Sequence, residues 1–548
     1  MAKEKTFIAE TFLYLAAIIL WYGCQWANFS GEYLDTDNYY RALRVMFFME
    51  KPTYWEQIFA FSNYPFGEVL HWTRLLDWFW AALAIPFSFF YPLKDAIFYS
   101  GLFIAPLCFT AGAWYLVKCG RGLFNWKYRL LTAVLIIVQA NVMRAVVLNR
   151  PDTHAGLFLL AAFILYKMLK FCKYCKIKDL IFASVACALA LFLAVEGLFM
   201  ALVILAFLYY AYLVLGYSYR SLLYFSFYYA VCLTLFGLMN PPYQGFLFVD
   251  SGRISIFYVV IFWSVYLSLY LGKFIKNNLL QGCFFLLCAL SLLGIYVRFG
   301  WLSTPVAPEV MEPFIDRVSE MEAGNLYTLA YPFCALLCGL YLLKIHFYNA
   351  KFMFLLIALF VFTGLAATSM RFTLYAGIIA AFMLTLFVMQ TSRKKMACCF
   401  FILLEYIAFI IQVLCGNVQS KQPINLPVKD FIGLPKGTFA TDIFFAPYLI
   451  WYGGHSVIAS PYHRNVEGIV DGHKIFFSEN EDEVRALLDK HQVKYVLLLP
   501  NYDVEYYSMP EKNSNKLYGK ILGSKQYPVW LKPLHEGNYY LFLYDKEK

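Results

Sequence analysis

The chain has 548 residues, of which 61% are hydrophobic, 20% are aromatic and only 15% are charged. Together with a mean hydropathy of +0.59, this composition excludes a water-soluble globular protein and a disordered chain, and it indicates a polytopic membrane protein. The net charge of +10 lies entirely in residues 1–415, and its basic residues occupy short loops between apolar runs, so no nucleic-acid partner is expected.

Fourteen apolar runs in residues 1–415 approach the length of about 20 residues that a helix needs to cross a bilayer. They lie near 7–28, 76–92, 96–117, 130–148, 154–170, 179–195, 197–215, 221–239, 254–272, 280–297, 327–344, 351–368, 371–390 and 397–415. The second run is doubtful, because its apolar stretch from Trp78 to Tyr91 is short and contains Pro86.

Loop charge indicates that this second run does not cross. Without it, the N-terminus and six loops lie on one side of the membrane and collect 19 of the 30 basic residues in 1–415, against Glu4, Glu10 and Asp179. Basic loops stay in the cytoplasm. The sequence therefore predicts thirteen spans, a cytoplasmic N-terminus and an extracytoplasmic tail, with 76–92 as a re-entrant or interfacial helix.

The chain is expected to form two domains. A transmembrane domain covers 1–415 and has large outer loops at 29–95 and 298–326, and an extracytoplasmic domain covers 416–548. The tail alternates short apolar runs with a charged helical pattern at 481–490, which is typical of a small α/β domain. None of the 14 cysteines follows Cys415, so this domain is not a disulfide scaffold.

Three acidic clusters fall on the predicted outer side. They are Asp35 with Asp37, Asp152 with His154, and Glu320 with Glu322. Carboxylates beside a bilayer are costly unless they are solvated, paired or bound to a metal, and Mg²⁺ or Mn²⁺ prefers carboxylate oxygens. Each cluster alone can simply cap a helix or solvate a loop, and the imidazole can be a cap or a ligand, but three clusters on one face favour a shared site for a divalent metal.

Arg371 begins one of the later apolar runs, at the predicted outer boundary. A guanidinium at this position can snorkel to the lipid headgroups as an anchor, or it can clamp a phosphate through two donors. Its position alone does not decide between these two interpretations.

In the order of these features, the chain resembles the catalytic subunits of oligosaccharyltransferases, which belong to the C-type membrane glycosyltransferases that use polyprenyl-linked sugars. Six segments carry the resemblance: Asp37-Asn38-Tyr39-Tyr40-Arg41, Asn63-Tyr64-Pro65-Phe66-Gly67, Asp152-Thr153-His154, Val318-Ser319-Glu320, Arg371, and Ile450-Trp451-Tyr452-Gly453-Gly454-His455 followed by Asn465 and Asp471. The resemblance implies thirteen spans, two large outer loops and an outer C-terminal domain.

It also implies roles for single residues. Asp37, Asp152 and Glu320 would hold the metal, with His154 as a further ligand in the place where the family has an acid. Arg371 would bind the phosphate of the donor. Trp451, Tyr452, His455 and Glu322 would contact the acceptor, and among the catalytic carboxylates Asp37 is the first candidate for a general base and Asp35 the second.

One departure from the family concerns the acceptor. Tyr452 and Gly453 stand where the family carries the Trp and Asp that read the hydroxyl of an Asn-x-Ser/Thr acceptor, so a glycan, a lipid or another cell-surface molecule is favoured over a protein sequon. The implied function is transfer of a sugar or oligosaccharide from a polyprenyl phosphate or pyrophosphate to an extracytoplasmic acceptor, in a bacterial inner membrane. The alternatives are an N-linking oligosaccharyltransferase proper, and a secondary transporter, whose internal repeats are not found in this sequence.

Overall fold

The computed structural model describes residues 2–51, 57–298, 307–310, 314, 318, 322–414, 428–499 and 515–548. The chain divides into two compact units. The helical unit consists of Met1–Glu32, Trp72–Thr304 and Glu320–Val418, and the sheet unit consists of Tyr33–His71, Pro305–Ser319 and Gln419–Lys548. Parts of both predicted outer loops therefore group with the C-terminal tail and not with the helices that flank them in sequence.

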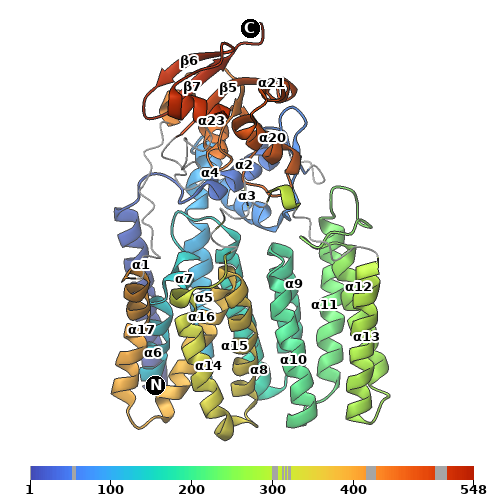
Figure 1. Ribbon diagram of the computed structural model, residues 1–548. Coiled ribbons are helices and arrows are strands. Elements are labelled where there is room, and N and C mark those ends of the chain that lie inside the picture. The colour runs from blue at the N-terminus through green and yellow to red at the C-terminus, as the bar shows by residue number, and fades with distance from the viewer. Residues whose placement is uncertain are drawn as a thin grey trace. The chain divides into compact units, whose positions relative to one another are not determined.

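Helices build the helical unit, and many of the long apolar ones stand side by side in Figure 1. The helices of this unit are α1 (Ala2–Ala27), α3 (Leu75–Ser88), α4 (Leu93–Gly101), α5 (Ile104–Arg121), α6 (Trp126–Ile137), α7 (Ala140–Arg144), α8 (Thr153–Tyr174), α9 (Ile177–Leu193), α10 (Gly197–Leu215), α11 (Arg220–Met239), α12 (Ile256–Gly272), α13 (Asn278–Arg298), α14 (Leu326–His346), α15 (Ala350–Thr368), the short η4 (Met370–Phe372), α16 (Thr373–Gln390) and α17 (Lys394–Leu414). Most of them are buried on one side, and α16 is buried almost all round.

Within the described residues, eight helical segments are long and apolar enough to cross a membrane, which identifies an integral membrane protein. They are Leu93–Arg121, α8, α10, α11, α13, α14, α15 and Met370–Gln390. Two further apolar helices, α3 and α12, are shorter. The 14 residues of α3 extend about 21 Å, less than the hydrocarbon thickness of about 30 Å. The expected count of thirteen stays a prediction.

The expected span at 130–148 is divided in the structure. Helix α6 ends at Ile137, and α7 begins at Ala140, after two intervening residues. Between them, the buried side-chain amide of Gln139 donates to the carbonyl oxygens of Leu135 and, at 3.2 Å, of Gly377 in α16. A Cβ at position 377 would lie only 2.4 Å from Gln139 Oε1, so this break depends on a glycine far along the chain.

A five-stranded mixed sheet organises the other unit, in the order β4-β3-β5-β7-β6. The strands are β3 (Thr438–Ala440), β4 (Ser456–Val457), β5 (Val493–Leu498), β6 (Leu531–Glu536) and β7 (Tyr540–Tyr544), accompanied by α18 (Val428–Ile432), α19 (Ala446–Tyr448), the π-helical turn η5 (Leu449–Gly453), α20 (Val466–Phe477), α21 (Glu481–Lys490), α23 (Leu517–Gly519) and the π-helical turn η7 (Lys520–Ser524). Strands β4, β3 and β5 run parallel, whereas β7 pairs antiparallel with β5 and β6. The tail is thus the small α/β fold that its alternating pattern predicts.

Both outer loops add pieces to this unit. The first supplies α2 (Thr36–Glu50) and the hairpin of β1 (Ile58–Phe59) with β2 (Glu68–Val69). The second supplies η1 (Pro308–Val310) and Phe314, which share a small apolar core with Ile443, Ala459 and Ile469. Residues more than a hundred positions apart in the sequence therefore form one packed body.

Candidate functional site

The first acidic pair lies at the start of α2. Asp35 is the N-cap of this helix, and its carboxylate accepts a hydrogen bond from the backbone N–H of Asn38 at 3.2 Å. Asp37 lies in the first turn and is exposed. A carboxylate at an N-cap accepts a hydrogen bond from an otherwise unbonded N–H and interacts favourably with the helix dipole, so Asp35 has a structural function. Asp37 is therefore the better candidate for a chemical role.

Tyr39 joins two motifs that are 413 positions apart in the sequence. Its hydroxyl lies 3.1 Å from the hydroxyl of Tyr452 and accepts a hydrogen bond from the backbone N–H of Tyr33 at 3.2 Å. The Tyr39 ring also packs against Tyr448 and Trp451, at centroid distances of 4.9 and 5.9 Å. The structure therefore brings the Asp37-Asn38-Tyr39 motif and the Trp451-Tyr452 motif into one aromatic cluster.

The residues predicted to contact an acceptor differ in their exposure. Tyr452 is half-buried, whereas only 5% of Trp451 is exposed. His455 is fully buried, its Nε2 lies 2.9 Å from the carbonyl oxygen of Phe431, and its ring packs on Phe439. Burial lowers the pKa of His455, so the imidazole is neutral. This placement argues against the expected acceptor contact of His455 and gives the residue a structural role in the core.

Gly453 ends the turn η5 at a crowded position. A Cβ built on this residue would lie 2.2 Å from His455 Cδ2, and the next residue, Gly454, has a positive φ of 61°. The carbonyl oxygen of Gly453 accepts a hydrogen bond from the ammonium of Lys436. A side chain at position 453 would therefore require the buried His455 ring to move.

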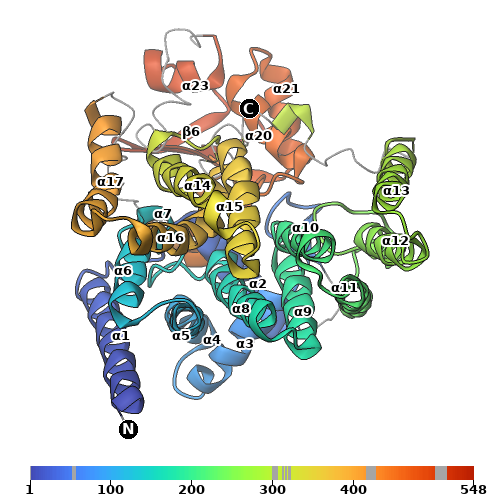
Figure 2. The same ribbon diagram turned by 90° about the horizontal axis from the view of Figure 1, so that it is seen from below.

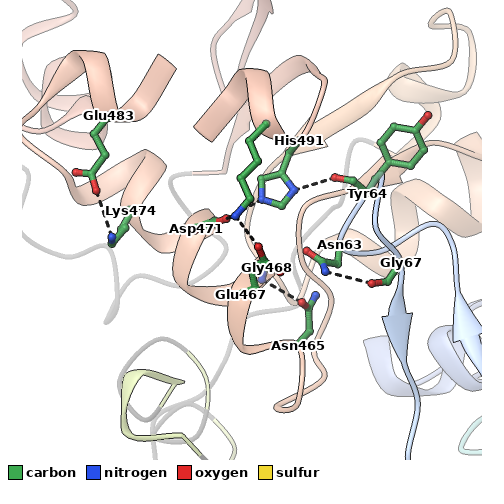
Figure 3. A network of polar contacts seen from close by, with 11 residues as sticks. Asn63, Tyr64, Gly67, Asn465, Glu467, Gly468, Asp471, Lys474, Glu483 and His491 are labelled. Atoms are coloured by element: carbon green, nitrogen blue, oxygen red, sulfur yellow. Dashed lines mark hydrogen bonds and ion pairs between the residues drawn. The ribbon is translucent and has the colours of Figure 1, made fainter. Parts of the chain in front are cut away.

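The segment Asn63–Gly67 attaches to the sheet through its backbone. The N–H of Tyr64 donates to Val457 at 3.3 Å, and the carbonyl oxygen of Tyr64 lies 2.8 Å from Nδ1 of the buried His491 (Figure 3). Nε2 of His491 lies 2.9 Å from Asp471 Oδ2, which Lys490 also contacts at 2.6 Å. Since both ring nitrogens face oxygen acceptors, only the doubly protonated imidazolium satisfies both contacts.

Electrostatics hold this network together. Burial alone would raise the pKa of Asp471, but the hydrogen bonds from His491 and Lys490 outweigh it and lower the pKa of this carboxyl. Lys490 also contacts Glu467 at 2.7 Å, and its two acidic partners raise the pKa of its ammonium against the effect of burial. The motif residue Asp471 is therefore an ionised anchor for the loop that carries Tyr64.

A second carboxyl in the same unit is protonated. Glu68, in β2, is buried, and it accepts hydrogen bonds from the hydroxyls of Ser62 at 2.9 Å and Ser460 at 2.8 Å. Burial raises the pKa of Glu68 to about 8, although its bonds to Ser460 and Asn465 act in the opposite direction. This carboxyl therefore holds the first outer loop against the sheet in its neutral form.

Asp152 lies at the start of α8, in the helical unit. Its Oδ1 accepts hydrogen bonds from the backbone N–H of Thr153 at 2.5 Å and from the Thr153 hydroxyl at 3.0 Å. Its Oδ2 lies 2.6 Å from His154 Nδ1 and 3.4 Å from Arg150 Nη2. Because the carboxylate can only accept, Nδ1 of His154 carries a proton, so in the neutral form of the ring the lone pair is on Nε2.

Arg371 lies in the turn η4, next to a carboxylate that the sequence analysis missed. Its Nη1 is 3.0 Å from Oε1 of Glu196, which lies between α9 and α10 and is only 7% exposed. The second oxygen of this carboxylate is buried without a hydrogen-bond partner among the described residues. The signal that could have revealed Glu196 is a single acid between two apolar runs, followed by a glycine.

The described end of the second outer loop lies along the same turn. The backbone N–H of Met370 donates to the carbonyl oxygen of Glu322 at 2.9 Å, and the N–H of Gly324 donates to Ala366 at 3.1 Å. A Cβ at Gly324 would lie 2.4 Å from the Ala366 oxygen, so this close approach requires glycine. Glu322 and Arg371, which were predicted for acceptor and donor binding, are thus neighbours.

The expected metal ligands are not assembled by these contacts. Glu320 lies outside the described residues, and Asp37 and Asp152 belong to different units. Among the described residues, no group of three or more His, Cys, Asp or Glu side chains is placed to hold a metal ion. The shared site of Asp37, Asp152 and Glu320 stays a prediction based on the motifs.

By sequence, the chain matches no protein-family model and no curated relative. By structure, it is similar to the archaeal oligosaccharyltransferase AglB from Archaeoglobus fulgidus in complex with an inhibitory peptide and a dolichol-phosphate, with a TM-score of 0.63 and 15% identity over 88% of this chain and 67% of that chain. It also matches the A. fulgidus enzyme tethered with an acceptor peptide containing the NVT sequon (TM-score 0.61, 16% identity, 92% and 70% covered). A third match is the same enzyme in complex with Zn and sulfate (TM-score 0.60, 17% identity, 94% and 70% covered). The chain therefore has the fold of an archaeal oligosaccharyltransferase, which confirms the resemblance that its motifs indicated.

Proposed function

We propose that the protein is a membrane glycosyltransferase that transfers a sugar or oligosaccharide from a polyprenyl phosphate or pyrophosphate to an acceptor outside the cytoplasm. The observation that carries this proposal is the oligosaccharyltransferase fold, which extends over 88 to 94% of the chain. The similar A. fulgidus structure holds a dolichol-phosphate, and we extend a lipid-linked phosphate donor to this chain.

Arg371 is the proposed ligand of the donor phosphate. Its ion pair with the buried Glu196 fixes one side of the guanidinium, which reduces the conformational entropy that donor binding would otherwise cost. As the bond to the sugar breaks, negative charge develops on the phosphate oxygen that leaves. A guanidinium already oriented toward that oxygen stabilises the charge without reorganising. If Arg371 were only an anchor at the membrane interface, it would not need a buried carboxylate as its partner.

For the divalent metal, Asp37, Asp152, Glu320 and His154 are the proposed ligands. The contacts of Asp152 fit this role through His154, since a metal-binding histidine commonly donates its other N–H to a carboxylate. When bound, the metal would offset the charge of the donor phosphate. A mixed set of carboxylates and imidazole favours Mn²⁺ over Mg²⁺.

For the acceptor, the half-buried Tyr452 beside the Asp37 motif is the proposed contact, with Trp451 behind it in the aromatic cluster and the exposed Glu322 from the second outer loop. The glycine at position 453 supports an acceptor other than a Ser/Thr sequon, because it offers no carboxylate to accept the hydroxyl. These residues are consistent with an acceptor that lacks this hydroxyl, or with a glycan whose hydroxyl is bound by other residues.

Transfer by the full-length protein in proteoliposomes tests the proposal. The vesicles receive a polyprenyl-pyrophosphate-linked oligosaccharide pool and are offered a sequon peptide, its Ser/Thr-to-Ala analogue and envelope glycans, with mass spectrometry of all products. We expect Mn²⁺-supported transfer that chelation abolishes and that does not depend on the peptide hydroxyl.

Asp37→Asn and Asp35→Asn form a matched pair for the same assay. Asparagine caps a helix as well as aspartate does, so Asp35→Asn preserves the start of α2 and should retain most of the activity. Asp37→Asn should lower the transfer rate at least about 10²-fold, as expected for the loss of a general base. If no donor is consumed with any acceptor, or if transfer depends strictly on the sequon hydroxyl, the respective part of the proposal is wrong.

A further inference from the structure

The helical unit contains an apolar cavity of about 540 Å³ between α1, α5, α6, α8 and α16. Its walls are formed by aliphatic and aromatic side chains such as Ile18, Trp21, Leu116, Phe158 and Phe382. Viewed from below, α1 stands at the edge of the unit beside α5 and α6 (Figure 2). The volume lies within the range of about 300–1,000 Å³ that is typical of ligand pockets.

One end of the cavity is charged. Arg129 and Gly120 line it there, and Arg129 forms an ion pair with the buried Glu10 of α1, which Arg121 also approaches at 3.7 Å. Arg129 additionally donates to the carbonyl oxygen of Phe124 at 2.9 Å, so its guanidinium is fixed at the rim. The carboxylate and the two guanidiniums together carry a net charge of +1.

Further basic side chains gather around the turn between α5 and α6. Lys351 donates to the carbonyl oxygen of Gly122 at 2.8 Å, and the ammonium of Lys394 lies 5.9 Å from the centre of the Tyr128 ring. Lys118, one turn before Arg121 on α5, has its ammonium over the rings of Trp114 and of Tyr166 in α8 and so faces away from the cavity. The turn and the adjacent end of the cavity thus carry four basic groups, Arg121, Arg129, Lys351 and Lys394, and one acidic group, Glu10.

We propose that this cavity binds an anionic phospholipid, with one acyl chain between α1 and the α5–α6 pair and its phosphate beside Arg121 and Arg129. The apolar walls match the chain, and the excess of positive charge at one end matches the headgroup. A zwitterionic lipid would satisfy the walls but would bring its own cation to the basic rim. Because α1 borders this cavity, the bound lipid would complete its packing against α5 and α6.

Native mass spectrometry of the full-length protein tests the proposal. The purified protein is delipidated and exposed to equimolar phosphatidylglycerol and phosphatidylcholine with matched chains. The expected result is one retained phosphatidylglycerol molecule. Each basic residue near a lipid surface contributes about 1 kcal/mol, so Arg121→Gln should reduce the preference for phosphatidylglycerol about fivefold. Lys276→Gln, which makes the same charge change at an exposed position on another turn, should not.

Ala133→Phe and its neighbour Val134→Phe test whether the lipid occupies the cavity. Ala133 lines the cavity, whereas Val134 is 40% exposed and is not part of its wall. Only Ala133→Phe should abolish the retention of phosphatidylglycerol. Ala17→Leu, a milder filling change, should reduce it if Ala133→Phe does not fold. The proposal would be overturned by equal retention of both lipids or by unchanged retention of phosphatidylglycerol in both filling variants. It would also be overturned if an equimolar polyprenyl phosphate displaced the phospholipid, because the cavity would then be assigned to the donor.

Discussion

At the scale of single residues, the aromatic cluster around Tyr39 connects two of the motifs, and the ion pair with Glu196 orients Arg371. Asp37 and Arg371 were predicted from the sequence because their residue types in those positions have a known chemistry. Glu196 could not be predicted, since its partner is 175 positions away and an isolated acid between apolar runs is also typical of a solvated loop.

Replacing Glu196 by Gln should separate its positioning role from a purely structural one. The amide keeps the volume and one hydrogen bond to Arg371 but removes the ion pair. We expect KM for the lipid-linked donor to rise several-fold while the thermal unfolding temperature stays within about 2 °C of the parent, as for a change of less than about 1 kcal/mol. Arg371→Lys should show the same pattern more strongly, because lysine cannot bind two partners in one plane. An unchanged KM in Glu196→Gln would refute the positioning role.

Gly453 offers a direct test of the crowding beside His455. Gly453→Ala should destabilise the sheet unit by about 1–3 kcal/mol, the usual cost of overpacking, because the new Cβ would lie 2.2 Å from the imidazole. Gly433→Ala is the matched control, since a Cβ there meets nothing within 4 Å. Thermal unfolding monitored by circular dichroism gives both values. Equal unfolding temperatures for the two variants would contradict the assigned geometry.

Glu68 predicts how the stability of the sheet unit depends on pH. The folded protein holds the proton of this carboxyl more tightly than the unfolded chain does, because the folded pKa is about 8 and the ordinary value is 4.5. The stabilisation is therefore fully present below about pH 4.5 and is lost as the pH rises through 8. Glu68→Gln should flatten the fall in unfolding temperature between pH 5 and 8.5. Glu50→Gln, an exposed change on α2, should leave it unaltered.

At the scale of elements, hydrophobic runs located nearly every helix to within a few residues, because apolar length is a local property. The break between α6 and α7 is an exception with a long-range cause. It depends on Gln139 reaching Gly377, a contact that has no signature in the surrounding sequence.

The turn between α9 and α10 should tolerate no side chain at its glycine. A Cβ on Gly197 would lie 2.2 Å from the backbone carbon of Ala190, and the backbone cannot yield as a flexible side chain does. Gly197→Ala should therefore displace Glu196 and lower both stability and donor affinity. Gly364→Ala in α15 is the control, since its Cβ meets nothing within 4 Å and alanine favours a helix. Donor titration and thermal unfolding of the two variants decide the matter.

At the scale of the whole molecule, the sequence predicted two domains divided near residue 415, whereas the compact units divide the chain differently. The sheet unit takes residues from both outer loops as well as from the tail. Composition could not reveal this, because α2 and the β1–β2 hairpin are recruited by contacts such as Tyr39 with Tyr452, which depend on the fold of the tail.

The membrane topology is open to a direct test. The charge asymmetry of the loops predicts that tags near Asp95 and after residue 415 are accessible from outside the cytoplasm, and that a tag at residues 392–395 is protected. Membrane-impermeant thiol labelling of single-cysteine variants in intact cells and in lysed cells measures this. A cytoplasmic signal near Asp95 would mean that 76–92 spans the membrane and would reverse the order of the later loops.

The pairing of the Asn63–Gly67 segment with β4 also has a consequence for biosynthesis. Tyr64 finds its partner Val457 only after 393 further residues have been made, which takes about 20–80 s at 5–20 residues per second. During that time the first outer loop has emerged while its binding surface does not yet exist. The nascent chain must therefore expose the apolar side of α2, with its buried Tyr39, Tyr40 and Leu43, to the aqueous side of the membrane. We expect a chain truncated before the tail to recruit chaperones through this segment and to be cleaved there by proteases that spare the complete protein.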